Sequence, residues 1–85
     1  MRETAYIGEI LDISTGKRNE QFAYRVGREC VLDFNFIVEG RPMVVFYPNG
    51  SYFSTSIVQE VEQTDYGYWI TTMNRKYRFD RIRGL

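Results

Sequence analysis

Turn signals recur at short intervals along most of this chain, and their spacing constrains the fold more than any other feature. Clusters of turn-forming residues separate segments that are rich in β-branched and aromatic side chains. These clusters are at residues 39–42, 48–50, 64–67 and 74–75. Segments of about four to eight residues between such turns are typical of short antiparallel strands. The pattern therefore predicts an all-β domain, built as a small barrel or sandwich.

The expected strands can be placed from alternation and turn chemistry. In residues 31–38, Leu32, Phe34, Phe36 and Val38 alternate with Asp33 and Asn35, so one face of this strand should be buried. The Asn49-Gly50 pair is the strongest hairpin signal, because both residues accept a positive φ. The other expected strands are residues 43–47, 52–54, 57–63 with a corner at Thr55-Ser56, 68–73 and 77–82, the last two joined by a tight turn at Asn74-Arg75.

The first third of the chain is less regular. Residues 5–13 form an expected strand, in which a bulge at Gly8-Glu9 would restore the inward direction of the apolar side chains. Residues 22–26 fit either a strand or one short helical turn. The helical alternative is favoured, with Asn19 as its cap and Gly27 as its stop.

A length of 85 residues corresponds to one domain, residues 1–85, and 16% of these residues are aromatic. Large rings supply the buried area that so short a chain needs. Five or six short strands predict a strongly bent sheet that closes, or nearly closes, on itself. The first choice is a small SH3-like barrel of five or six strands, with one possible helical turn near residues 20–27. The second choice is an OB-like barrel.

The C-terminal half also carries a short pattern. Thr55-Ser56-Ile57-Val58 is followed by Thr72-Met73-Asn74-Arg75-Lys76-Tyr77-Arg78-Phe79. Read as T-S-x-V and T-x-N-x-x-Y-x-F, it resembles small uncharacterised SH3-like barrel proteins of bacteria and of their phages or mobile elements, over about half of the chain. The resemblance implies the barrel fold and no assigned activity. The pattern is equally consistent with a corner at Thr55-Ser56, a turn at Asn74 and an inward face at Tyr77 and Phe79.

The chemistry available to the chain is limited. Histidine is absent, and Cys30 is the single cysteine. Without these side chains, a Ser-His-Asp or Cys-His arrangement and the usual zinc sites are excluded. Cys30 precedes an apolar run and is expected to be a buried, inert side chain. We therefore predict no enzymatic activity, no cofactor and no metal, and, from the lack of a leader or membrane-spanning segment, a cytoplasmic location.

Basic residues concentrate near the C-terminus. Residues 1–74 carry 6 basic and 10 acidic side chains, a net of −4, whereas residues 75–85 carry 5 basic and 1 acidic, a net of +4. Single-stranded nucleic acid binds where cations meet exposed rings. Such a site would use Arg75, Lys76, Arg78 and Arg81, with Arg83 beyond them. A charged edge strand facing solvent is the favoured interpretation, and nucleic-acid binding is the alternative.

Aromatic residues beside the turns predict a protein-binding surface. Adjacent strand residues face opposite sides, so only one of Tyr68 and Trp69 can be in the core. A two-residue turn at Asn74-Arg75 would pair Tyr68 with Arg81, which turns Tyr68 inward and Trp69 outward. The predicted contact residues are Trp69, Tyr66 and Tyr52. The favoured function is a non-enzymatic module that binds another protein or self-associates through an edge strand.

Overall fold

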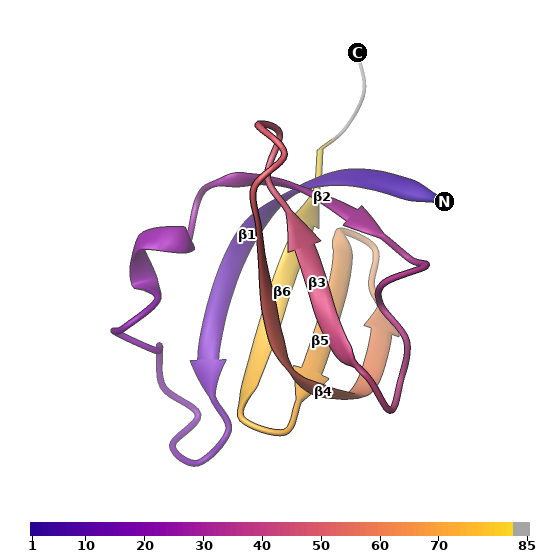
Figure 1. Ribbon diagram of the computed structural model, residues 1–85. Helices are drawn as coiled ribbons and strands as arrows, with labels where there is room; N and C mark the ends of the chain where they lie inside the picture. Colours follow the sequence, from indigo (N-terminus) through magenta and orange to yellow (C-terminus); the bar gives the residue numbers. More distant parts are fainter. Residues whose placement is uncertain (83–85) are drawn as a thin grey trace.

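Six antiparallel strands form one closed barrel in the computed structural model, which describes residues 1–82 (Figure 1). Each strand pairs with its neighbours in the chain, and β1 pairs with β6 to complete the ring. The strands are β1 (Arg2–Asp12), β2 (Glu29–Asp33), β3 (Pro42–Phe46), β4 (Tyr52–Gln63), β5 (Gly67–Thr72) and β6 (Arg75–Arg81). The predicted all-β barrel is confirmed. The sequential strand order differs from the Greek-key order of an OB-like barrel, so that second choice is wrong.

A bulge in β1 accompanies its pairing with two neighbouring strands, β2 and β6. The register of β1 against β6 skips Gly8, between Ile7 and Glu9. Ile7 and Ile10 consequently both point inward, and both are fully buried. The first half of β1 also pairs with β2. The predicted bulge at Gly8-Glu9 is therefore confirmed, and it allows this long strand to bend around the barrel.

A sharp bend in β4 carries the chain from one side of the barrel to the other. Residues before the bend pair with β3, and residues after it pair with β5. At the bend the Thr55 hydroxyl donates to the Ser56 carbonyl at 2.7 Å and accepts from the Met43 amide at 3.2 Å. These bonds satisfy backbone groups that the bend removes from the ladder. The predicted corner at Thr55-Ser56 is confirmed.

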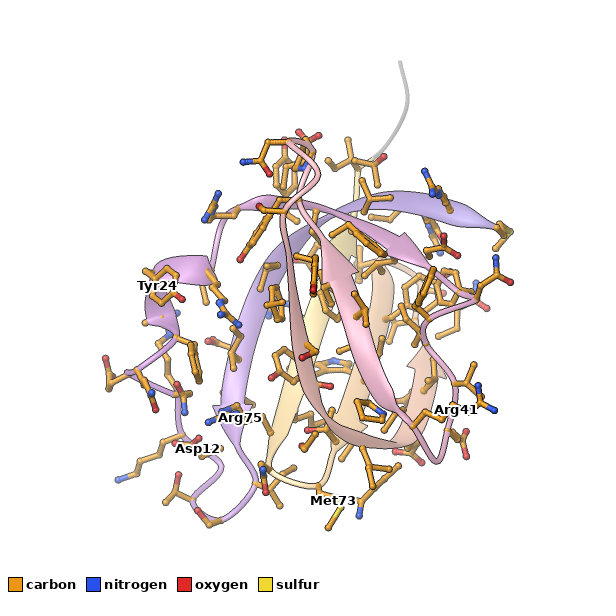
Figure 2. All side chains as sticks on the ribbon, in the orientation of Figure 1. Asp12, Tyr24, Arg41, Met73 and Arg75 are labelled. Carbon is orange, nitrogen blue, oxygen red and sulfur yellow. The ribbon has the colours of Figure 1, made fainter. Side chains whose placement is uncertain are left out.

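The segment before β2 contains the single helical turn of residues 1–82, η1 (Ala23–Arg25). The Asn19 side-chain oxygen accepts from the Phe22 amide at 2.8 Å, and Gly27 follows with a φ of 89°. This confirms the short-helix interpretation of residues 22–26, but Asn19 is not the cap: the N-cap is Phe22, without a side-chain capping bond. Figure 2 shows Tyr24 of η1 on the side of the barrel where Arg75 lies.

The core fills the inside of the barrel with large side chains. All six strands contribute buried hydrophobic residues to it. A column of rings crosses this core: Tyr47 lies 5.7 Å from Phe53, and Tyr77 stacks on Phe79 at 6.2 Å between centroids. Cys30 is also fully buried, and burial raises the pKa of its thiol to about 12. The predicted inert role of Cys30 is thereby supported.

Three local predictions were wrong in their details. The strand expected over residues 31–38 ends at Asp33, because the Asp33 carboxylate accepts from the Asn35 amide and begins a turn. As a result, Phe36 and Val38 are exposed instead of lying on the expected buried face, and Ile37 is buried. The loop after β3 is longer than the expected two residues, because the Tyr47 amide donates to the Ser51 carbonyl. Within residues 48–50, only Gly50 has a positive φ. A turn closed in this way, with a left-handed glycine, suits a three-residue hairpin loop.

The third correction concerns the last hairpin. Its turn is at Met73 and Asn74 rather than at Asn74-Arg75, so Tyr68 pairs with Phe79 and not with Arg81. The shift moves the register by two residues and therefore leaves every side chain on its predicted face.

Ring closure also means that β6 has a partner on both sides. The expectation that it is a solvent-facing edge strand was wrong.

Thr72 closes this hairpin from inside the barrel. Its side chain is fully buried. The hydroxyl accepts from the Arg75 amide at 3.1 Å and from the Ser56 hydroxyl at 3.0 Å, and it donates to the Arg75 carbonyl at 3.0 Å. One side chain thus holds the β5–β6 turn against the corner of β4.

We expect Thr72→Val to lower the free energy of unfolding by about 2 kcal/mol, because valine has a similar shape but leaves three partly buried polar groups without their partner. Thr71→Val is the matched control, since Thr71 is on the outward face of the same strand. It should change stability by less than about 0.5 kcal/mol. Urea denaturation followed by circular dichroism measures both changes. Equal effects would contradict the role assigned to Thr72.

Candidate functional site

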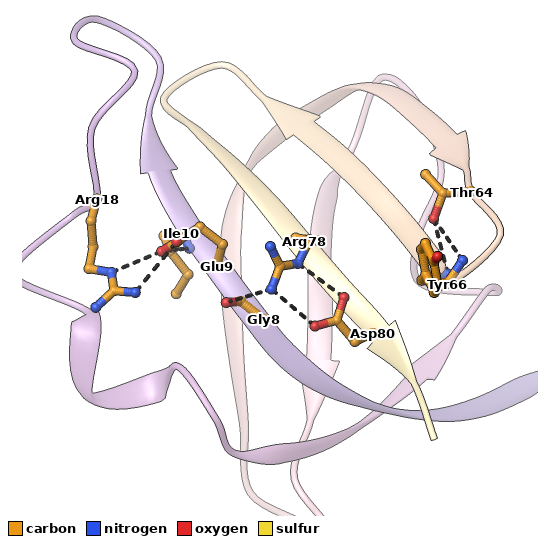
Figure 3. Close-up of polar contacts among 9 residues, drawn as sticks. Gly8, Glu9, Ile10, Arg18, Thr64, Tyr66, Arg78 and Asp80 are labelled. Carbon is orange, nitrogen blue, oxygen red and sulfur yellow. Dashed lines mark hydrogen bonds and ion pairs between the residues drawn. The ribbon is translucent and has the colours of Figure 1, made fainter. Parts of the chain in front are cut away.

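A tightly bonded turn between β4 and β5 forms one wall of the candidate site. The Thr64 hydroxyl accepts from the Tyr66 amide at 3.2 Å and from the Gly67 amide at 3.1 Å (Figure 3). The Tyr66 carbonyl in turn accepts from the Arg81 amide at 2.7 Å, which attaches the turn to β6. The Tyr66 side chain projects from this fixed backbone and is 72% exposed.

Trp69 forms the floor of the site on the outer face of β5. Its cross-strand partner is Arg78, and the Lys76 ammonium lies 5.0 Å from the centre of its ring. Trp69 is half-buried, whereas its neighbour Tyr68 is buried. The predicted outward direction of Trp69 is confirmed. Neighbouring cations restrict the indole ring without covering it completely.

An ion pair on β6 adds charge to the site. The Arg78 guanidinium donates to both carboxylate oxygens of Asp80, at 3.0 and 3.2 Å, and to the Gly8 carbonyl at 3.3 Å (Figure 3). This carbonyl is at the β1 bulge. The bulge therefore supplies an extra acceptor that orients Arg78 beside Trp69.

These elements enclose an open groove of about 490 Å³ on the outer surface of β5 and β6. It is lined by Thr64, Tyr66, Trp69, Arg78, Asp80 and Arg81. Two predicted protein-contact residues, Tyr66 and Trp69, are thus brought together with two predicted phosphate-binding residues, Arg78 and Arg81. Thr64 and Asp80 were not predicted from the sequence. Thr64 could have been found from its position three residues before Gly67, where a threonine hydroxyl often bonds the turn.

Tyr52 lies outside this groove. It begins β4, is 64% exposed, and its ring is 6.1 Å from that of Phe46. Phe36 packs on the other side of Phe46 at 5.5 Å. Tyr52 therefore belongs to a separate row of aromatic rings over β3 and β4, and the structure does not unite it with Tyr66 and Trp69.

The four predicted phosphate-binding residues do not share one surface. Lys76 and Arg78 face outward beside Trp69, whereas Arg75 lies against the ring of Phe22 at 4.7 Å. Arg78 is neutralised by Asp80, and Arg81 by Glu3. Arg83 lies outside the described residues. The four basic residues are divided between two faces, because alternate residues of β6 face opposite sides.

Glu3 anchors the end of the groove through two bonds. It accepts from the Tyr68 hydroxyl at 2.5 Å and from the Arg81 guanidinium. Burial raises the pKa of the Glu3 carboxyl, but the bonds from Tyr68 and Arg81 together outweigh this effect, so its pKa lies below the usual 4.5. The network ties the N-terminal part of β1 to β5 and β6.

A lowered pKa in the folded state favours the ionised carboxylate, so its contribution to stability is complete above the unfolded pKa and is lost as the pH falls through the folded pKa. We therefore expect the free energy of unfolding to decrease below about pH 4.5. Glu3→Gln should make this decrease less steep, and the exposed Glu62→Gln is the control. Urea titrations between about pH 3 and 7 measure the slopes. An unchanged slope for Glu3→Gln would contradict the network.

The groove presents a flat ring, a phenol and an ion pair. No group of three or more His, Cys, Asp or Glu side chains within residues 1–82 is arranged to hold a metal ion. None of the helical structure in that range is long and apolar enough to cross a bilayer. Comparison of the chain with protein-family models, curated proteins and solved structures gave no match.

Proposed function

We propose that this protein is a non-enzymatic module that binds a segment of another protein in the groove between Tyr66 and Trp69. The observation that carries the proposal is a half-buried tryptophan on the floor of an open groove, with the Arg78–Asp80 ion pair beside it. Tryptophan, tyrosine and arginine are the residues that most often dominate the energy of protein interfaces. SH3-type barrels commonly use such aromatic grooves for extended peptides.

The charge of the groove favours a protein over nucleic acid. Arg78 is paired with Asp80, and Arg81 is paired with Glu3, so both main cations already have carboxylate partners. A phosphate chain would have to compete with these carboxylates. A peptide can instead lay an apolar side chain on Trp69 and offer a polar group to either member of the Arg78–Asp80 pair.

Membership of the bacterial or phage SH3-like proteins, and a cytoplasmic location, remain predictions from the sequence.

The proposal can be tested with a random peptide library displayed on phage and selected against the purified protein. We expect selected peptides to bind in a manner that requires Trp69. Trp69→Ala should weaken binding by about 2 kcal/mol, the loss typical of an interface anchor, as measured by isothermal titration calorimetry. Because Trp69 is on the outer face, the variant should keep a cooperative urea transition.

Tyr52→Ala is the matched control, since Tyr52 is exposed but outside the groove. It should bind the selected peptides as the unmodified protein does. Peptides that lose affinity with Tyr52→Ala and keep it with Trp69→Ala would place the interface on the Phe36–Phe46–Tyr52 row and would refute the groove.

A further inference from the structure

Three arginines gather beside η1, away from the groove, without carboxylate partners. Arg25 and Arg75 lie against the same ring, that of Phe22, at 4.5 and 4.7 Å. Arg25 also lies 4.1 Å from the centre of the Phe53 ring, and Arg28 lies 4.2 Å from that of Tyr47. The rings of Phe53 and Tyr47 are themselves in contact. The three guanidinium groups therefore lie against a connected set of rings, Phe22, Phe53 and Tyr47.

The ion pairs of residues 1–82 do not include this cluster. Arg2, Arg18, Arg78 and Arg81 each form an ion pair with a carboxylate. Arg25, Arg28 and Arg75 form none within the same part of the chain; Arg41 forms none either, but Figure 2 shows it away from Arg75. Asp12 is opposite Arg75 in the β1–β6 register, but its carboxylate accepts from the Asn19 side chain at 2.7 Å. Three like charges held together without a counter-charge create a positive field that attracts anions.

Two buried polar atoms at the cluster also lack partners. They are the Nε of Arg75 and the hydroxyl oxygen of Tyr47. Tyr47 as a whole residue is 8% exposed. Burial raises the pKa of the Tyr47 hydroxyl, and the charges of Arg25 and Arg28, which lie against the rings of Phe53 and Tyr47, oppose this effect. Buried donors in folded proteins nearly always have an acceptor. An oxyanion would supply acceptors to the guanidinium groups beside them.

We propose that Arg25, Arg28 and Arg75 form a binding site for a phosphate monoester. Guanidinium groups match the geometry of phosphate oxygens and remain charged at every physiological pH. A phosphate monoester carries a charge of about −1.5 to −2 at pH 7, which suits three cations better than the single charge of a carboxylate. Stacking on aromatic rings holds the guanidinium groups before the ligand arrives, so little side-chain freedom is lost on binding.

The exposed ring of Tyr24 adds a second feature to the site. Tyr24 is 62% exposed, its hydroxyl accepts from the Arg25 Nε at 3.2 Å, and the Arg25 guanidinium lies 5.4 Å from its ring. A flat group attached to the phosphate could stack on this ring. The phosphate is the feature common to a free phosphate, a sugar phosphate and a nucleotide, and a titration with each of these compounds separates the three sources.

The test is an NMR titration of the ¹⁵N-labelled protein with inorganic phosphate, ribose 5-phosphate, adenosine 5′-monophosphate and adenosine. We expect the phosphate-bearing probes to shift the Nε–H signals of Arg25, Arg28 and Arg75 at millimolar concentration, and added salt to weaken this binding. Adenosine alone should cause no such shift. Stronger binding of the nucleotide, lost in Tyr24→Ala, would assign the site to nucleotides. Equal binding of all three phosphate probes would assign it to the phosphate alone.

Arg28→Gln is the decisive variant, because Arg28 is exposed and its removal leaves the packing of Phe22 and Phe53 in place. It should weaken phosphate binding about tenfold, as loss of a charge-assisted bond does. Arg25→Gln should have a similar effect if its amide spectrum remains that of the folded protein. Arg41→Gln is the control at an exposed arginine outside the cluster. Absence of shifts up to about 20 mM phosphate, or equal weakening by Arg41→Gln and Arg28→Gln, would overturn the proposal.

Discussion

Gly67→Ala is expected to lower the free energy of unfolding by about 4 kcal/mol or more, because the new methyl group has no room. A Cβ at this position would lie 2.0 Å from the Phe79 carbonyl oxygen, on the neighbouring strand β6. The obstacle is backbone rather than a flexible side chain, so β5 and β6 would have to separate. The whole stability of a domain of this size is about 4–13 kcal/mol. The variant should therefore lose most of its cooperative urea transition.

Gly40→Ala is the control that isolates the contact from the backbone conformation. Gly40 also has a positive φ, of 90°, but nothing lies within 4 Å of the position that a Cβ would occupy there. Alanine at residue 40 should lower stability by only about 1–2 kcal/mol, the cost of the left-handed conformation. Equal losses in the two variants would show that conformation alone, and not the approach of β5 to β6, requires glycine at residue 67.

Phe79→Ala should be the most damaging truncation in the core, with an expected loss of about 3–5 kcal/mol. Phe79 is the largest fully buried side chain of the described residues, and its ring stacks on Tyr77 with 9° between the planes. The strands of a closed barrel cannot easily move inward to fill the resulting cavity, because each is bonded on both sides. Thermal and urea denaturation measure the loss.

Two further variants show whether the loss comes from the cavity. Phe79→Leu retains much of the volume and should recover more than half of the stability. Phe36→Ala removes a ring that is 47% exposed and packs on the outward-facing Phe46, so it should lower stability by about 1 kcal/mol. A small loss in Phe79→Ala, comparable with that of Phe36→Ala, would contradict the position of Phe79 at the centre of the core.

Side-chain direction was predictable from the sequence where a regular strand formed, because it then depends on alternation. Tyr68 and Trp69 face the predicted sides even though the hairpin turn is one residue earlier than expected, since an even register shift preserves the faces. The exact turn was not predictable. The Thr72 hydroxyl bonds the backbone of Arg75 and also accepts from the Ser56 hydroxyl at the corner of β4, a contact between distant residues that alternation does not reveal.

The strand end at Asp33 was missed for a related reason. Alternation of Phe34 and Phe36 with polar residues continues beyond the point where the Asp33 carboxylate bonds the Asn35 amide. A side-chain cap of this kind competes with the ladder but leaves the hydrophobic pattern intact.

The candidate site was predictable only in part. Tyr66 and Trp69 were found because they flank a turn signal, whereas Tyr52 flanks a different turn on another part of the barrel. The cluster of Arg25, Arg28 and Arg75 could not be found, because its members come from η1, the residues before β2, and β6. Only ring closure and the packing of residues 13–28 bring them together.

The pairing of β1 with β6 closes the barrel, so it determines when folding can be completed. Gly8 and Arg78 meet there, although they are 70 positions apart in the chain. Closing so long a loop costs entropy that local hairpins do not have to overcome, and contacts of this separation slow folding. The β3–β4 and β5–β6 hairpins can form from neighbouring residues, but Ile7 and Ile10 stay uncovered until β6 arrives. During synthesis, β1 therefore leaves the ribosome first, and its apolar side chains stay exposed to solvent until β6 has been made and pairs with it.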